Sequence, residues 1–160
     1  MILYHGSNLS IDTIDLLKSK KAKDFGQGFY LSKDKTQALK MAELTTFRTN
    51  KGTPTLTAFD FDENHFHDSL LNVKIFDGYS EEWAHFIFLN RKNASTTPAH
   101  SYDIVVGPIA DDTVGVQIRR FIMGYIDIHQ LVKELSYISG PTIQYFFGTE
   151  KSIKLLKKLP

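Results

Sequence analysis

Cysteine is absent from the chain, which excludes a disulfide scaffold, a thiolate zinc site and a thiol nucleophile. An excess of charge of either sign is absent too, because 19 Lys and Arg residues stand against 18 Asp and Glu residues. A net charge of +1 gives the chain no overall attraction to nucleic acid or to an anionic membrane. Any recognition of a charged ligand must therefore depend on a local patch.

Long hydrophobic runs are also missing, since none approaches the roughly 20 residues of a membrane span. The first five residues are too short and too polar for the core of a signal peptide. We therefore expect a cytoplasmic protein that does not contact a membrane, with secretion as an effector by a non-classical route as the alternative. Without internal repeats or a low-complexity linker, residues 1–160 are expected to form a single domain.

The order of predicted elements indicates the fold class. Short β-branched and aromatic runs between turn residues predict strands at residues 2–4, 28–31, 55–61, 103–106 and 143–147. Capping residues followed by hydrophobic residues at helical spacing predict helices at residues 34–47, 80–91 and 112–124, at a segment beginning at Asp127, and at residues 149–159. Strands first and last, with helices clustered between them, predict an α+β fold rather than a doubly wound parallel sheet.

The first candidate site is the segment Tyr4-His5-Gly6-Ser7. It places a titratable ring at the end of a hydrophobic strand, followed by the residue type that lets another molecule approach the backbone closely. Such a pattern is typical of a binding edge. A strand end capped by His5, with an ordinary turn after it, explains the same residues without a ligand.

The second candidate site is the segment from residue 24 to residue 32. Gly26 and Gly28 leave the backbone bare, and Phe25, Phe29 and Tyr30 offer flat faces on which a ring can stack. It is not a dinucleotide fingerprint, because these glycines precede a predicted strand and the fingerprint glycines follow one. A buried core strand is the alternative explanation of the aromatic residues.

Other common sites find little support. His65 and His67 stand near Asp60, Asp62 and Asp68, but a spacing of two residues on a polar turn is weak for a metal site. We therefore predict no metal. Serine hydrolysis is equally unsupported, because no Gly-x-Ser-x-Gly elbow is present.

Three segments together carry a resemblance to known proteins. They are residues 4–7, residues 28–32 and residues 144–147. In order and spacing they resemble the signature strands of diphtheria-toxin-like and poly-ADP-ribose-polymerase-like ADP-ribosyltransferases, which are known by a His, Tyr, Glu triad. Over nearly its full length the chain more closely resembles a small bacterial family of unknown function numbered 3990. The segments shared with that family are residues 24–32, Glu82-Trp83, Asn90-Arg91 and residues 102–112.

The resemblance implies a split, mainly antiparallel core of two sheets with flanking helices, and NAD as the donor substrate. It implies that His5 hydrogen-bonds a ribose hydroxyl, that the Gly6 backbone bonds the nicotinamide carboxamide, and that Tyr30 stacks on the nicotinamide ring. The loop of residues 18–27, with Lys23, would lie over the pyrophosphate. The remaining residues of the implied NAD-binding set are Tyr4, Ser7, Phe25, Gly26, Gly28, Phe29 and Ser32. We expect His5 and Tyr30 to line a cleft rather than fill the core.

The sequence departs from the triad at its third position. Where the wider superfamily has a glutamate, this chain has Gln144, followed by Tyr145. Cleavage of the glycosidic bond builds positive charge on the ribose, so a carboxylate helps by its charge and by fixing the hydroxyls, whereas an amide can only fix them. Extension of a poly-ADP-ribose chain is therefore not expected. Glu150 is the nearest carboxylate in the sequence, but it is expected to begin the last helix.

With His5, Tyr30 and Gln144 as catalytic residues, the resemblance implies a mono-ADP-ribosyltransferase that modifies a macromolecule, a protein rather than a nucleic acid. It also implies a toxin or effector role with an antitoxin protein as partner. Two alternatives stay open. One is a non-catalytic module that binds NAD or ADP-ribose, and the other is an NAD glycohydrolase.

Overall fold

The computed structural model describes residues 1–110, 112–138 and 140–160. Asp111, which belongs to the shared segment 102–112, lies outside the described residues, as does Ser139.

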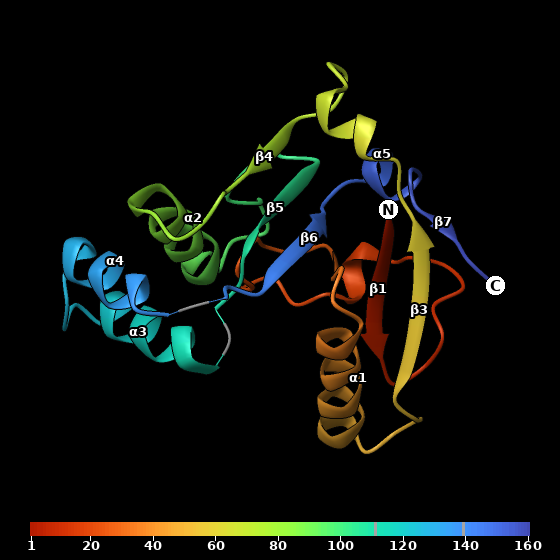
Figure 1. The fold of residues 1–160 in the computed structure, drawn as a ribbon, viewed down its shortest axis with the longest axis horizontal. Coiled ribbons are helices and arrows are strands. Elements are labelled where there is room, and N and C mark those ends of the chain that lie inside the picture. Colours follow the sequence, from red (N-terminus) through yellow and green to blue (C-terminus); the bar gives the residue numbers. More distant parts are fainter. Residues whose placement is uncertain (111, 139) are drawn as a thin grey trace.

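Two separate β-sheets form the centre of the fold (Figure 1). The first sheet is antiparallel in the order β1-β3-β7, with strands β1 (Ile2–Ser7), β3 (Thr55–Asp60) and β7 (Lys157–Lys158). The second has the order β2-β6-β5-β4, with strands β2 (Phe29–Leu31), β6 (Ile143–Phe147), β5 (Ile104–Pro108) and β4 (Val73–Ile75). Only the β4–β5 pair in these ladders is parallel. The predicted α+β class with two mainly antiparallel sheets is therefore confirmed.

Helices cover both sheets. The α-helices are α1 (Lys35–Thr49), α2 (Glu81–Lys92), α3 (Asp112–Ile122), α4 (Ile128–Ser136) and α5 (Glu150–Ile153). Two short 3-10 helices are η1 (Leu16–Lys18) and η2 (Glu63–His67). In Figure 1, α2, α3 and α4 gather beside the four-stranded sheet, whereas α1 lies along β1 and β3.

Capping residues begin the predicted helices where the sequence places them. The side chains of Asp34, Ser80 and Asp127 accept hydrogen bonds from backbone N–H groups in the first turns of α1, α2 and α4. These bonds satisfy donors that a helix cannot pair internally. At the other end of α1, Asn50 adopts the left-handed conformation with a φ of 51°.

The four-stranded sheet is the middle layer, because its two faces enter different hydrophobic clusters. Tyr30, Val105 and Phe146 pack with residues of α2, α3 and α4. Their neighbours Ile104 and Phe147 pack instead against residues of the three-stranded sheet. Successive side chains of a strand point to opposite faces, so the near-continuous hydrophobic runs in β5 and β6 follow from burial on both sides.

The two sheets meet at one bridge and then separate. The Tyr4 N–H donates to the Ser32 carbonyl at 2.8 Å, and the Ser32 N–H donates to the Tyr4 carbonyl at 2.9 Å. Beyond this bridge the chain from β2 turns into α1, which begins directly after its cap Asp34. Past Tyr4, no strand of the described residues pairs with that edge of β1. The open edge is the feature that creates the site described below.

One predicted element is wrong and two strands were not predicted. The expected helix over residues 149–159 ends at Ile153, and the chain then forms β7, which pairs with β3. Ile153 and Leu156 point inward as expected, each 9% exposed. A two-residue strand of lysines carries no sequence signal, because it is held by main-chain pairing alone. β4 is equally short, and it is held by its parallel pairing with β5.

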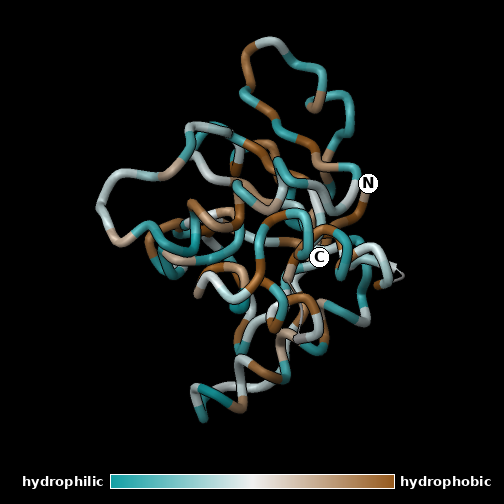
Figure 2. The backbone as a smooth tube through the Cα atoms, turned by 90° about the vertical axis from the view of Figure 1, so that its left-hand side faces the viewer, coloured by the Kyte–Doolittle hydropathy of each residue, from teal (hydrophilic) through white to brown (hydrophobic). Residues whose placement is uncertain are grey.

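Hydrophobic and hydrophilic residues are interleaved along the backbone (Figure 2). Within residues 1–110, 112–138 and 140–160, no helix is long and apolar enough to cross a membrane.

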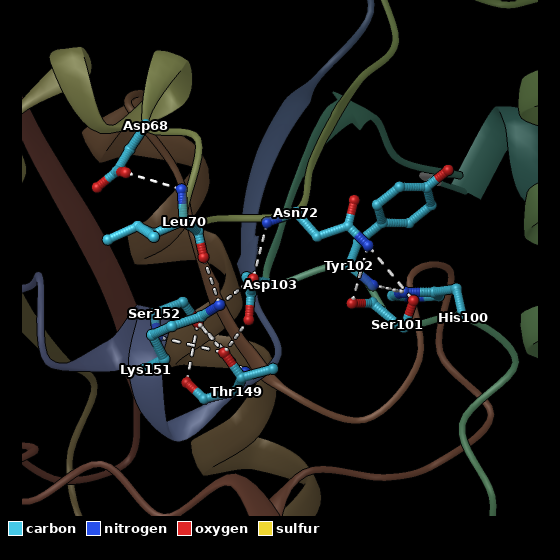
Figure 3. A network of polar contacts seen from close by, with 10 residues as sticks. All are labelled: Asp68, Leu70, Asn72, His100, Ser101, Tyr102, Asp103, Thr149, Lys151 and Ser152. Atoms are coloured by element: carbon cyan, nitrogen blue, oxygen red, sulfur yellow. Dashed lines mark hydrogen bonds and ion pairs between the residues drawn. The ribbon is translucent and has the colours of Figure 1, made fainter.

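A buried carboxylate ties β5 to the segments around it (Figure 3). Asp103, which is 5% exposed, accepts the Asn72 N–H at 2.8 Å, the Thr149 hydroxyl at 2.7 Å and the Lys151 ammonium at 2.9 Å. Burial raises the pKa of this carboxyl, but the three hydrogen-bond donors together outweigh burial and hold the pKa below 3.8. The ionised form is therefore the one that the fold stabilises.

Asp103→Asn is expected to lower the free energy of unfolding at neutral pH by about 1–3 kcal/mol, because charge-assisted hydrogen bonds become neutral ones. The folded pKa is depressed, so this contribution is present above the unfolded pKa of 3.8 and is lost as the pH falls through the folded value. Urea unfolding of the wild type and the variant at neutral and acidic pH measures the effect. An equal difference between the two proteins at both pH values would contradict it.

Candidate functional site

A cavity of about 1040 Å³ lies where the two sheets separate. It is bounded by β1, β2, the first turns of α1 and the loop that precedes β2. The predicted site residues that line it are Tyr4, His5, Gly6, Ser7, Lys23, Gly28, Phe29, Tyr30, Ser32 and Gln144. The structure thus brings all three predicted catalytic residues to one cavity. Phe25 and Gly26 are not among its lining residues and instead line a second cavity of about 390 Å³.

His5 is held in one orientation by its surroundings. Its Nδ1 lies 2.8 Å from the Tyr30 carbonyl oxygen, and its ring stacks on Phe29 with the centroids 4.4 Å apart. Burial lowers the pKa of His5, which the hydrogen bond to the Tyr30 carbonyl partly opposes. A neutral imidazole whose Nδ1–H donates to a carbonyl has its lone pair on Nε2. His5 can therefore accept a hydrogen bond from a hydroxyl group of a ligand.

Gly6 presents backbone groups at the open edge of β1. Tyr4 bonds Ser32 through its N–H and carbonyl, and residues of an antiparallel strand alternate between its two edges. The N–H and carbonyl of Gly6 consequently point to the same edge as those of Tyr4, where no further strand pairs with β1 in the described part of the chain. One donor and one acceptor side by side are the groups that a planar carboxamide requires.

Tyr30 is both a core residue and a cavity residue, which differs from the expectation that it lines the cleft only. Its side chain is 9% exposed, and Phe146 packs edge-on against the ring at 5.2 Å. The hydroxyl donates to the Gly26 carbonyl at 2.6 Å and accepts the Phe25 N–H at 3.1 Å. Burial raises the pKa of Tyr30 well above 10, so the ring stays neutral. Tyr30 thereby anchors the glycine-rich loop as well as the cavity wall.

Gln144 is nearly buried, with 8% of its surface exposed. Tyr30 pairs with Phe146 across β2 and β6, so Gln144, two residues before Phe146, lies on the same face as Tyr30. Among the described residues, none forms a hydrogen bond with the side-chain amide of Gln144. Its side-chain N and O are not among the buried atoms that lack a partner in the described part of the chain, so they are open to the cavity, where a ligand or water can pair with them.

A largely buried ion pair that was not predicted, Asp24 with Arg91, also lines the cavity. The Asp24 carboxylate accepts Arg91 Nε–H at 2.7 Å through one oxygen and the Ala110 N–H at 2.8 Å through the other. Both side chains are largely buried, with exposures of 12% and 22%. Of the carboxylates that line the cavity, Asp24 is largely buried and Asp12 and Asp15 are exposed, whereas Glu150 lies exposed at the start of α5. The signal available in the sequence was that both residues belong to segments shared with the family that the chain resembles.

A family model matches residues 1–158. The chain belongs to DUF3990, a family described as a protein of unknown function. No curated protein and no solved structure matches it.

The glycines of this DUF3990 chain have structural roles beside any role in binding. A Cβ atom on Gly6 would lie 1.8 Å from the Ala38 carbonyl oxygen, so the missing side chain lets α1 pack against β1. A Cβ atom on Gly28 would lie 2.2 Å from the Phe146 ring. The group that approaches each of these glycines where a side chain would stand is therefore part of the protein, the α1 backbone at Gly6 and the Phe146 ring at Gly28. At Gly6 the backbone N–H and carbonyl stay available to a ligand at the open edge of β1.

The structure does not add further metal ligands to His65 and His67 within the described residues. Within the described residues, no three His, Asp or Glu side chains are placed to hold a metal ion. His65 faces Asp68 at 3.9 Å, at the end of η2.

Proposed function

We propose that this protein binds NAD in the cavity between β1 and β2 and transfers a single ADP-ribose to a macromolecular acceptor, with release of nicotinamide. The observation that carries the proposal is the unpaired side-chain amide of Gln144, a nearly buried residue that shares the cavity with His5 and with the open edge at Gly6. These polar groups are set in a largely hydrophobic wall, which is the composition typical of a cofactor site. The order of the segments 4–7, 28–32 and 144–147, which resembles that of ADP-ribosyltransferases, supports the same choice.

The polar groups fit the nicotinamide riboside part of NAD. The N–H and carbonyl of Gly6 match the carboxamide, and the face of Tyr30 supplies a flat wall for the ring. The Nε2 lone pair of His5 accepts a ribose hydroxyl, and the amide of Gln144 bonds a neighbouring hydroxyl. Arg91, oriented by Asp24, supplies positive charge for the phosphates.

The chemistry follows from this pose. The bond between the ribose carbon and the nicotinamide nitrogen breaks, and its electron pair leaves with the now neutral nicotinamide. The ribose carbon becomes cationic and is attacked by the acceptor, which loses a proton. His5 and Gln144 hold the ribose hydroxyls through this change, so the ribose carbon stays in place for attack by the acceptor.

A non-catalytic NAD-binding module is the second candidate. It is favoured by the electrostatics of the cavity, because Gln144 is neutral and the Asp24 carboxylate is paired with Arg91. Because Arg91 already neutralises the buried Asp24 carboxylate, the site offers less stabilisation to a cationic ribose. The two candidates differ in turnover and not in binding.

Incubation of the purified protein with NAD labelled in its adenylate part, with and without a cell lysate, separates the candidates. A transferase releases nicotinamide and labels a protein of the lysate, whereas a binding module does neither. Free ADP-ribose formed at high turnover without lysate would instead indicate NAD hydrolysis. Treatment of the labelled lysate with protease or nuclease identifies the class of acceptor, which we expect to be protein. The antitoxin partner and the toxin role stay predictions.

A further inference from the structure

The ammonium group of Lys23 lies on the aromatic ring of Tyr30. The Nζ atom is 4.4 Å from the ring centroid, well within the range of a cation–π interaction. Lys23 belongs to the loop between η1 and β2, where its carbonyl accepts the Gly26 N–H at 3.1 Å. Its side chain lines the large cavity. The lysine therefore does not extend toward solvent, as lysines in a loop usually do.

Lys23 also acts on His5. Burial is the main cause that lowers the pKa of His5, and the positive charge of Lys23 lowers that pKa further. Burial likewise lowers the pKa of Lys23 itself, against the opposing effect of Asp24. The ammonium group thus lies in the part of the cavity that is shared by His5 and Tyr30.

The part of the Tyr30 ring that Lys23 covers is the part that faces the cavity. Phe25 packs nearly parallel to the Tyr30 ring, with the centroids 6.2 Å apart and the planes at 17°, and it does not line the large cavity. Phe146 meets the ring edge-on. Lys23 and Tyr30 both line the cavity, and the ammonium group of Lys23 is the cation that lies over the ring there.

We propose that the cavity face of Tyr30 is a site for a flat organic cation, and that Lys23 is its internal occupant. A ligand ring reaches Tyr30 only after Lys23 has moved away, since two cations repel each other and cannot share one ring face. The inference rests on the proposed function, because the pyridinium ring of NAD is a cation of this class. It adds that the site is self-occluded and that it selects the charged ring.

The size of the effect follows from competition for the ring. The apparent dissociation constant equals the intrinsic constant divided by the fraction of molecules in which the site is vacant. A cation–π contact of ordinary strength leaves the site vacant in a minority of molecules, so removal of the lysine tightens cation binding by roughly two- to thirtyfold.

The probe that tests this inference is the 1-methylnicotinamide cation, which is methylated on its ring nitrogen and carries no phosphate. Calorimetry measures its binding. The probe separates occlusion of the ring from any contact of Lys23 with phosphate. We expect Lys23→Met, which keeps the length of the side chain without its charge, to tighten binding of this probe by roughly two- to thirtyfold. Lys23→Arg keeps a cation over the ring and is expected to bind like the wild type. Neutral nicotinamide is expected to gain less than the charged probe.

Equal dissociation constants in the wild type and Lys23→Met would overturn the inference, and so would the absence of probe binding in every variant. Thermal unfolding of each variant shows whether the loop change has altered the fold. NAD turnover of the wild type is measured separately. If the wild type turns over NAD but Lys23→Met does not bind the probe more tightly, only the proposed role of Lys23 is wrong. If Lys23→Met binds the probe more tightly but the wild type does not turn over NAD, the cation site stands and the transferase proposal is wrong.

Discussion

His5→Asn is expected to lower NAD turnover by about a hundredfold, the order of effect when one positioned hydrogen-bonding group is removed from a closed active site. The asparagine amide can take the place of Nδ1 and keep the bond to the Tyr30 carbonyl, which lies 2.8 Å from Nδ1 in the wild type. It cannot reach as far as Nε2. The loss should therefore appear in kcat/KM for NAD and not in the melting temperature.

The pH dependence of the wild type provides a second readout for His5. Burial, supported by the charge of Lys23, lowers the pKa of His5 below 6.5, so the neutral ring persists through neutral pH. Protonation of Nε2 at lower pH removes the acceptor, and NAD use should fall on the acid side of 6.5 only. If His5→Asn retains full turnover, Nε2 does not contact the substrate.

Gln144→Ala is expected to lower NAD turnover by about ten- to a hundredfold, because one hydrogen bond that orders the ribose is worth about 1–3 kcal/mol in a closed site. The fold should tolerate the change, since no described residue hydrogen-bonds the Gln144 amide. Single-turnover kinetics and thermal unfolding measure the two effects.

Gln144→Glu is the matched partner of that variant, because it keeps the size of the side chain and adds a charge. A negative charge beside a ribose that becomes cationic should preserve turnover or add NAD hydrolysis. A binding module would gain nothing, and the charge would weaken its affinity for the NAD phosphates. If neither substitution changes turnover in a folded protein, Gln144 lies away from the chemical centre.

Much of the fold could be predicted because local signals agree with it. The caps Asp34, Ser80 and Asp127 mark the starts of helices, and the β-branched and aromatic runs mark the longer strands. The sequence does not predict β4 and β7, because these short strands are stabilised by pairing with a neighbouring strand and not by the β-propensity of their own residues. The spacing of three residues between Ile153 and Leu156 predicts a helix over the whole tail, but the same spacing also fits a turn followed by a strand, which is what the structure shows.

The candidate site could be predicted in part for a similar reason. Motif order groups His5, Tyr30 and Gln144, and the structure places all three on one cavity. Each lies on a strand whose register is fixed by its neighbours. Loop residues were less predictable. Phe25 belongs to the hydrophobic core and a second cavity, and Lys23 lies on Tyr30 rather than in solvent, because their positions depend on tertiary contacts.

The measurement that tests the central claim most directly is an electron-density map of crystals soaked with NAD. We expect the nicotinamide ring against Tyr30, its carboxamide on the N–H and carbonyl of Gly6, and a ribose hydroxyl on Nε2 of His5, with Lys23 displaced from its position 4.4 Å from the ring centroid. Crystals of His5→Asn serve as the control and should show weaker density for the ribose. NAD bound elsewhere, or a cavity without NAD at saturating concentration, would contradict the assignment of this cleft as the NAD site.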